Sequence, residues 1–200
     1  MSIKSKTLLL ILISLIFSSA LSFTLISSNY QNKISSNNCC NPNVTTFGGT
    51  LIDRGVGVGV DSQENIIITG YSESFGGYNV YVVKFDSYLN HLWNASWPIN
   101  KFDSPCDLVI DSGDNIYVAG TIWEEITPGN FSKNVFILKF DSDGNILWDR
   151  TWQTSTHEEA YCVALDAIED VYVAGSTTAS SGTIFILKYS SAGVYQWNVS

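Results

Sequence analysis

Hydrophobic and polar positions along this chain follow a pattern that repeats three times. The segments "NIIITG", "NIYVAG" and "DVYVAG" are β-branched and aromatic runs that each end at a glycine. The segments "YNVYVVKFD", "KNVFILKFD" and "GTIFILKYS" are runs of the same kind that end at turn residues. Such runs predict short β-strands. Successive side chains of a strand point to opposite faces of its sheet. In the second set the residues on both faces are apolar, so we expect these strands to be covered on both faces.

The repeat keeps fixed internal distances. In each copy an aspartate is followed nine residues later by a glycine, and a lysine nine residues later by a tryptophan. Two copies carry a second tryptophan four residues on, and Phe47 holds the corresponding place before the first copy. The repeated residues are Asp61, Gly70, Lys84, Trp93, Trp97, Asp111, Gly120, Lys139, Trp148, Trp152, Asp166, Gly175, Lys188 and Trp197. Only the distance from glycine to lysine varies, which places all length variation in one loop.

Each copy contains four predicted strands within about 50 residues, once the short apolar runs before the aspartate and before the tryptophan are included. Four antiparallel strands repeated at this interval, in sheets covered on both sides, predict the blades of an all-β, β-propeller fold. We expect the propeller repeats over residues 45–200, with blades at about 47–97, 98–152 and 153–200.

The repeat resembles a known family. The D-x-x-(G)-N-x-Y-V-x-G, K-[FY]-D and G-N-x-x-W segments resemble the SBBP repeat, the seven-bladed β-propeller repeat of exported prokaryotic proteins. The resemblance covers about residues 45–200, with departures at Gln63, Glu64, Asp170 and Ser190. A weaker similarity links the Gly-x-x-x-Trp segments at Trp148 and Trp197 to the tryptophan-docking repeat of quinoprotein dehydrogenases. That similarity implies tryptophans that join one blade to the next. Nothing matches the ligands of the quinone cofactor, so no cofactor is expected.

The ring is expected to be incomplete. Closed propellers typically use four to eight blades, and this sequence supplies three. An open arc would leave two apolar blade faces in water. Two alternatives therefore stand: the chain is a fragment of a longer one that carries the missing blades, or several copies assemble into a ring.

The amino-terminal residues predict export. Two lysines precede an apolar run over residues 8–17 and then small residues up to Ser22, which is the layout of a secretory signal. Read on to Ile26, the same run is long enough for an uncleaved membrane anchor. We therefore expect a signal or anchor helix at 1–22, a polar linker at 23–44, and a body that is secreted or held on the extracellular face of the membrane. Membrane contact is expected only through the amino-terminal segment.

The composition of the chain argues against one class of partner, and its sequons and cysteines indicate which residues lie at the surface and which are buried. The formal net charge of −9 makes nucleic acid a poor partner, since like charges repel. Four Asn-x-Ser/Thr sequons are possible N-glycosylation sites and are expected at the surface: Asn43, Asn94, Asn130 and Asn198. Cys106 and Cys162 lie in predicted strands and are expected to be small buried apolar residues. Whether they or Cys39 and Cys40 form disulfides is left open.

The polar residues of the repeat could serve either a chemical role or a structural one. Asp61, Asp111 and Asp166 could each begin a metal loop, but a turn aspartate that accepts backbone N–H groups explains its recurrence in every copy, so no metal is expected. Asp53, Asp103 and Glu158 share one register and could supply a catalytic pair of acids. Their presence in every copy favours a scaffold role. His91 and His157 have no nucleophile near them in the sequence.

The variable loop is the candidate binding site. In the second copy it carries Trp123, Glu124, Glu125 and Phe131, which could contact a protein or a carbohydrate. The sequence thus predicts an exported, non-enzymatic binding module or cell-surface scaffold. The alternative is part of a propeller enzyme, a glycoside hydrolase or quinoprotein-type oxidoreductase, whose catalytic residues lie in missing blades.

Overall fold

The computed structural model describes residues 25–27, 43–74, 79–97, 103–154, 156–177 and 182–200. These residues form three four-stranded antiparallel sheets and one two-stranded sheet, with no helix among them, which confirms the all-β prediction and its four-stranded units. None of the described residues belongs to a helix able to span a membrane. The predicted signal or anchor at 1–22 lies outside the described residues. In the predicted linker and at its end, β1 (Leu25–Ser27) pairs with β2 (Asn43–Thr45).

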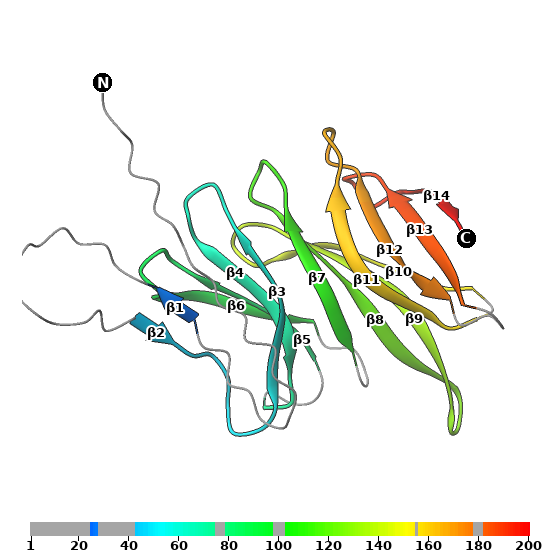
Figure 1. Cartoon of the computed structure of the whole chain (residues 1–200), viewed down its shortest axis with the longest axis horizontal. Helices are drawn as coiled ribbons and strands as arrows, with labels where there is room; N and C mark the ends of the chain where they lie inside the picture. The colour runs from blue at the N-terminus through cyan, green and yellow to red at the C-terminus, as the bar shows by residue number, and fades with distance from the viewer. Residues whose placement is uncertain (1–24, 28–42, 75–78, 98–102, 155, 178–181) are drawn as a thin grey trace, which may run out of the picture.

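The three large sheets, which we call blades 1, 2 and 3, each pair their strands in chain order. Blade 1 contains β3 (Asp53–Val60), β4 (Ile66–Ser72), β5 (Asn79–Phe85) and β6 (His91–Trp97). Blade 2 contains β7 (Ser104–Ile110), β8 (Ile116–Thr127), β9 (Asn130–Phe140) and β10 (Ile146–Trp152). Blade 3 contains β11 (Glu158–Leu165), β12 (Val171–Thr177), β13 (Thr183–Tyr189) and β14 (Tyr195–Val199). The blades stand face to face in a row, and their first strands β3, β7 and β11 are neighbours, as in a propeller (Figure 1).

The repeat aspartate holds the turn between the first two strands of each blade. In blade 2, Asp111 Oδ1 accepts hydrogen bonds from the backbone N–H groups of Gly113 (3.0 Å) and Asn115 (2.8 Å). Asp61 and Asp166 accept the corresponding bonds in blades 1 and 3. This geometry is the one that a turn role requires.

The repeat lysine pairs with that aspartate within the same blade. Lys84 Nζ lies 2.9 Å from Asp61 Oδ2, and both side chains are buried. Burial acts to raise the pKa of Asp61, but hydrogen bonds from Asn65 and Lys84 outweigh it and hold the pKa below its ordinary value. The same pairing links Lys139 to Asp111 at 3.3 Å and Lys188 to Asp166 at 3.4 Å. In each blade the repeat lysine therefore ties the third strand to the first turn, and in blade 3 Lys188 also pairs with Asp170 at 2.9 Å.

The repeat glycine lies beside a β-bulge in the first strand. In blade 2 the register of β7 on β8 slips between Pro105 and Asp107, next to Gly120. A Cβ on Gly120 would lie 2.4 Å from the backbone oxygen of Ser104 and 2.5 Å from the ring of Phe136. Gly70 and Gly175 lie beside the same register shift in their own blades, and a Cβ on either residue would lie 2.0 Å from a backbone oxygen. Only glycine fits this position without movement of the backbone.

Tryptophan joins each blade to the next. Trp93 Nε1 and Lys84 Nζ in blade 1 both donate to the backbone oxygen of Ser142, in the β9–β10 turn of blade 2, at 3.1 Å. The same contact joins blade 2 to blade 3, with Trp148 Nε1 and Lys139 Nζ as donors and Ser191 O as acceptor, at 3.2 Å and 3.4 Å. We call this arrangement the tryptophan contact.

A glycine in the receiving turn makes room for the indole ring. Gly144 has φ +87°, and a Cβ there would lie 2.9 Å from the ring of Trp93. Gly193 has φ +75°, and a Cβ there would lie 2.8 Å from the ring of Trp148. The left-handed backbone and the close approach both favour glycine, so the turn glycine and the tryptophan of the preceding blade depend on each other.

The second tryptophan of blades 1 and 2 packs on an aromatic ring of the next blade. Trp97 lies 5.2 Å from Phe136, and Trp152 lies 5.0 Å from Phe185, measured between ring centroids. Phe47 takes the corresponding position before blade 1, where its ring lies 6.0 Å from that of Tyr81. Phe47 therefore contacts the outer face of blade 1 as a tryptophan from a preceding blade would.

The two ends of the row differ. One apolar core lies between blades 1 and 2 and another between blades 2 and 3. The outer face of blade 1 is also buried, since Ile66, Val83 and Phe85 form a third cluster against which Phe47 packs. The outer face of blade 3 is exposed at Ile184 and Ile186. The expectation of two exposed blade faces was therefore wrong: Phe47 helps to cover one of them.

The bulge glycines give a first test. We expect Gly120→Ala to lower the free energy of unfolding by about 1–3 kcal/mol, the usual cost of overpacking a filled site. Urea titration of the full chain measures this as a lower midpoint at constant slope. Gly113→Ala is the matched control, because a Cβ there would meet only side-chain atoms of Asn115 and Asp111, at 3.2 Å and 3.4 Å. Equal midpoints for the two variants would contradict the argument.

Candidate functional site

The variable segment of blade 2 is a hairpin of two long strands. Strands β8 and β9 contain 12 and 11 residues, whereas the corresponding strands of blades 1 and 3 contain 7 each. The prediction of a loop was wrong, because the inserted residues continue the antiparallel ladder, with Trp123 opposite Lys133 and Glu125 opposite Phe131. We call residues 122–134 the projecting hairpin; it extends beyond the other strands at the end away from the aspartate turns (Figure 1).

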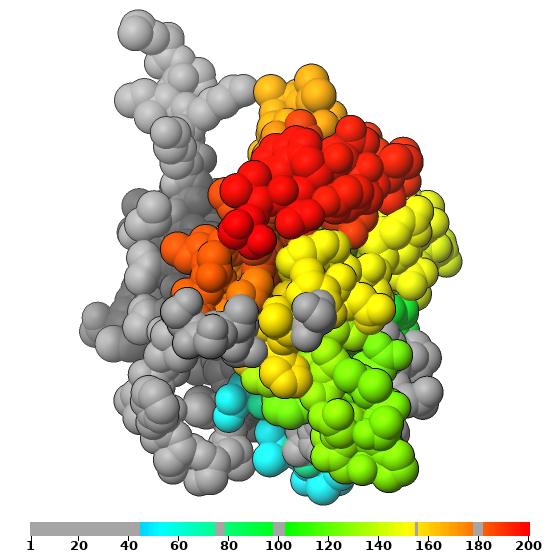
Figure 2. All heavy atoms as spheres, turned by 90° about the vertical axis from the view of Figure 1, so that its right-hand side faces the viewer, coloured from blue at the N-terminus to red at the C-terminus, as the bar shows by residue number. Residues whose placement is uncertain are grey.

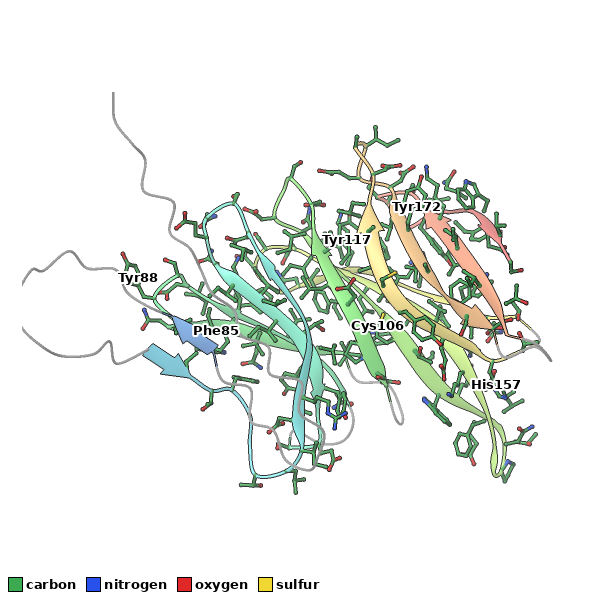
Figure 3. The ribbon with its side chains drawn as sticks, viewed as in Figure 1. Phe85, Tyr88, Cys106, Tyr117, His157 and Tyr172 are labelled. Carbon is green, nitrogen blue, oxygen red and sulfur yellow. The ribbon has the colours of Figure 1, made fainter. Side chains whose placement is uncertain are left out.

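Trp123 is held in place by charged neighbours. Lys133 Nζ lies 4.5 Å from the centre of the indole ring, within the range of a cation–π contact. The same ammonium group forms an ion pair with Glu159 of blade 3, and its hydrogen bond lowers the pKa of Glu159. The backbone N–H of Lys133 also donates to His157 Nδ1 at 3.2 Å; His157 is labelled in Figure 3. The ring thus lies against a lysine that is itself tied to blade 3, while 38% of Trp123 stays exposed.

The other predicted binding residues shape the hairpin. Glu124 Oε2 accepts a hydrogen bond from Asn134 Nδ2 at 2.9 Å, and Glu125 Oε1 accepts one from the N–H of Gly129 at 3.0 Å. Both glutamates are exposed, and Phe131 is half-buried. At the tip, Ile126 is 63% exposed. The structure therefore brings the four predicted residues onto one projecting element, with aromatic, apolar and acidic groups together on a convex surface.

Sequence reasoning did not find Lys133, Glu159 or Ile126. Lys133 and Glu159 act as a pair only because the hairpin of blade 2 lies beside the first strand of blade 3. Ile126 looks like an ordinary strand residue in the sequence, and only its place at the tip makes it prominent. The one available signal was that Lys133 stands opposite Trp123 if the variable segment is paired as a hairpin, whereas the prediction was a loop.

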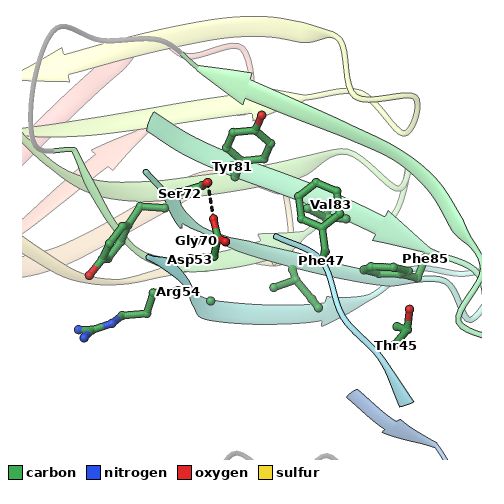
Figure 4. A pocket seen from close by; sticks show the side chains of 12 residues that line it. Thr45, Phe47, Asp53, Arg54, Gly70, Ser72, Tyr81, Val83 and Phe85 are labelled. Carbon is green, nitrogen blue, oxygen red and sulfur yellow. Dashed lines mark hydrogen bonds between the residues drawn. The ribbon is translucent and has the colours of Figure 1, made fainter. Parts of the chain in front are cut away.

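The acids that share a register do not form a common site. Asp53 accepts hydrogen bonds from the N–H of Gly49 (2.7 Å) and the hydroxyls of Ser74 (3.1 Å) and Ser72 (Figure 4). Glu158 accepts them from Thr154 and Thr156. Each acid thus holds the segment that enters its own blade, and among the described residues no three metal-ligating side chains come together.

Asp103 differs from the other two acids. Its carboxylate is buried, and neither oxygen has a hydrogen-bond partner among the described residues. Burial raises the pKa of Asp103 to about 7, because a charged form without partners is costly away from water. Asp103 is therefore a buried acid that titrates near neutral pH.

A small pocket lies on the outer side of blade 1, beside Phe47, Asp53 and Tyr81 (Figure 4). Its volume of about 50 Å³ is room for one or two water molecules. Sites for small organic ligands usually enclose roughly 300 Å³ or more. This pocket is too small to hold a sugar ring or a cofactor.

The sequons and cysteines occupy different surroundings. Asn94, Asn130 and Asn198 are exposed; the side chain of Asn43 lies outside what the structure describes.

Cys106 is half-buried, and burial raises the pKa of its thiol to about 12, as suits a small apolar residue. The prediction that Cys162 is buried was wrong. Cys162 pairs with Ala174 on the outer face of blade 3, which no described blade covers.

Comparisons with known proteins show a distant similarity to a repeat protein. No family model matches the chain. The chain is 27% identical over 155 aligned residues to an uncharacterized WD repeat-containing protein of Acanthamoeba polyphaga mimivirus, covering 53% of this chain. The match spans only 11% of that relative's length. Together with the three blades, this similarity supports a repeat protein of the propeller type.

Asp103 gives a second test. Between about pH 4 and pH 7 the unfolded chain carries this carboxylate ionised while the folded chain keeps it protonated. The unfolded state then binds fewer protons, so Asp103 makes the folded chain less stable as the pH rises through this range. We expect Asp103→Asn to gain stability relative to the unmodified chain from pH 4 to pH 7, and no further above that, in urea titrations.

Asp86→Asn is a control for which the change in stability with pH has the opposite sign, because the pKa of Asp86 is lowered and not raised. The side-chain hydrogen bond from Asn90 lowers the pKa of Asp86, so the stability that Asp86 contributes is present above its unfolded pKa and is lost as the pH falls. This variant should lose stability relative to the unmodified chain as the pH rises to about 4, and the difference should stay constant from pH 4 to pH 7. If Asp103→Asn gave a constant difference at every pH, the buried acid would not titrate in this window.

Proposed function

We propose that this chain is a non-enzymatic, exported binding module of the propeller type, and that the projecting hairpin of blade 2 contacts a protein partner. The hairpin is the one observation that carries the proposal: it adds an exposed element to a scaffold whose four-stranded sheets and turn aspartates repeat from blade to blade. Binding residues are commonly found on such departures from a rigid frame.

The chemistry of the hairpin suits a protein interface. Protein interfaces favour aromatic anchors that are held in place before binding, since little conformational entropy is then lost. Trp123 is such an anchor, because Lys133 lies against its ring and Glu159 holds Lys133. Ile126 adds exposed apolar surface at the tip, and Glu124 and Glu125 add negative charge beside it. A partner with a basic rim around an apolar pocket would complement this surface.

A protein partner fits better than a carbohydrate or a substrate. The hairpin is convex, whereas sites for small ligands are concave and enclose most of the ligand. The acids in one register, which could have formed a catalytic pair, are used within their own blades at Asp53 and Glu158. The distant WD repeat-containing relative is consistent with a scaffold role but is itself uncharacterized.

Export is the part of the proposal that rests on the sequence. The lysines and apolar run at the amino terminus have the layout of a signal or anchor. Three sequons are exposed, and one of them, Asn130, is the first residue of β9, directly after the hairpin turn. We place the chain outside the cell or on the extracellular face of the membrane, as part of a propeller with further blades.

The hairpin can be tested by photo-crosslinking. A photoreactive phenylalanine analogue at Ile126, in the full chain expressed in its own cells, should yield a discrete protein adduct. The control position is Tyr88, which is 67% exposed in a turn of blade 1. With the isolated partner, Trp123→Ala should weaken binding about tenfold or more, as expected for an interface anchor, while Tyr88→Ala leaves affinity unchanged.

Three outcomes would count against the proposal. Equal adducts at both positions would show that the hairpin is not selective. A glycan array that retains the chain through Trp123, without a protein adduct, would favour a carbohydrate ligand. An unchanged affinity for Trp123→Ala would remove the anchor. Trp123→Phe keeps an aromatic ring over Lys133 and distinguishes lost contact from a disturbed hairpin.

A further inference from the structure

The outer face of blade 3 is an exposed apolar surface. Ile184 is 75% exposed and Trp197 is 42% exposed, with Ile186 and Val199 beside them on the same face. Figure 2 looks onto this end of the row, with the carboxyl-terminal strand in front. The corresponding residue of Ile184 in blade 2 is Val135, which is fully buried against blade 3. Large exposed apolar patches of this kind mark sites of association.

This face repeats the surface by which blade 2 binds blade 3. In blade 2, Lys139 lies 4.6 Å from the ring of Tyr117, and the ring of Trp148 lies 5.9 Å from it. In blade 3, the corresponding distances from Tyr172 are 5.0 Å to Lys188 and 6.0 Å to Trp197. Figure 3 shows the two tyrosines at equivalent places in their sheets. The side chains of the tryptophan contact are thus already arranged on blade 3.

The contact itself is incomplete on blade 3. Trp148 Nε1 donates to Ser191 O, but Trp197 Nε1 has no acceptor among the described residues. Among the described residues, Lys188 forms ion pairs with Asp166 and Asp170 of its own blade and reaches no turn of another blade, whereas Lys139 also donates to Ser191 O. What is missing is a turn that presents a backbone oxygen to Trp197 and Lys188.

A second copy of this chain cannot supply that turn. The turns that contain Gly144 and Gly193 already receive Trp93 and Trp148. The third such turn, in blade 1, has Leu89 in place of the glycine, with φ 68° and its side chain buried in the outer cluster of blade 1. Because even a Cβ at this position would lie within 3 Å of the indole, a leucine there excludes the tryptophan of another blade.

We infer that the outer face of blade 3 binds a further four-stranded blade of this repeat, whose last turn carries glycine where blades 2 and 3 have Gly144 and Gly193. This blade is the next repeat of the same polypeptide, since both existing interfaces join blades that are consecutive in the chain. The inference rests on the part of the proposed function that places this chain in a propeller with further blades, but not on the role of the projecting hairpin. The outer face of blade 3 lies at the other end of the row from the face that Phe47 covers.

The test adds one blade to the full chain. Duplicating residues 152–200 directly after Ser200 places a tryptophan four residues after Trp197, as Trp152 follows Trp148. Cys162 lies on the face in question and is exposed, so its alkylation rate, followed on its own peptide by mass spectrometry, reports whether the face is covered. In the added unit the copy of Cys162 is replaced by serine.

We expect the added blade to slow alkylation of Cys162 about tenfold or more, as protection by a docked element requires. The matched control carries leucine at the added copy of Gly193, as blade 1 does at Leu89, and should leave Cys162 as reactive as in the original chain. Equal reactivity in all three proteins, including through failure of the added blade to fold, would overturn the inference. So would equal protection by the leucine variant.

The original chain provides a second measurement. Its Cys162 should alkylate at a rate that is independent of protein concentration, because a second copy offers no free glycine turn. Protection that grows with concentration and is lost in Trp197→Ser would show that copies of this chain cover the face themselves. That outcome would replace the inferred blade by self-assembly, whatever the crosslinking of the hairpin shows.

Discussion

A β-sheet that is apolar on both faces is stable only while each face is covered, and the arrangement of this chain follows from that constraint. Blade 2 meets it fully, since its faces lie against blades 1 and 3. Apolar packing alone does not fix one sheet at a particular angle and height on another. The tryptophan contact adds direction, because one indole N–H and one ammonium group converge on a single backbone oxygen of the next blade.

The same constraint explains why charged groups are buried in a core of valine, isoleucine and phenylalanine. An unpaired lysine at Lys84 would be costly away from water, and so would an unpaired aspartate at Asp61. Paired at 2.9 Å, with further hydrogen bonds on both sides, they are satisfied. The ammonium group also donates to the neighbouring blade, so one side chain contributes both to the turn of its own blade and to the interface.

Local features of the fold were predictable from the sequence, and contacts between distant segments were not. Strand runs, turn aspartates and fixed spacings are local signals, and they correctly indicated four-stranded units. The pairing of lysine with aspartate was missed although both residues stood out, since it depends on the register of strands that are joined through a segment of variable length. The acceptor for Trp93 is a backbone oxygen, and because every residue has one, the sequence does not mark it. The only sequence feature that accompanies this contact is Gly144, which makes room for the indole ring. The projecting hairpin was read as a loop because length variation by itself does not tell an extended ladder from an irregular segment.

The separation of donor and acceptor along the chain has a consequence for synthesis. Trp93 and its acceptor Ser142 are 49 residues apart, and Trp148 and Ser191 are 43 residues apart, with the acceptor always the later residue. A chain that emerges amino terminus first therefore completes each interface only when the following blade has appeared. Until then one apolar blade face is exposed to water at the growing end of the chain. A pause of translation between blades would leave that face open to aggregation, whereas the Phe47 side of blade 1 would already be protected.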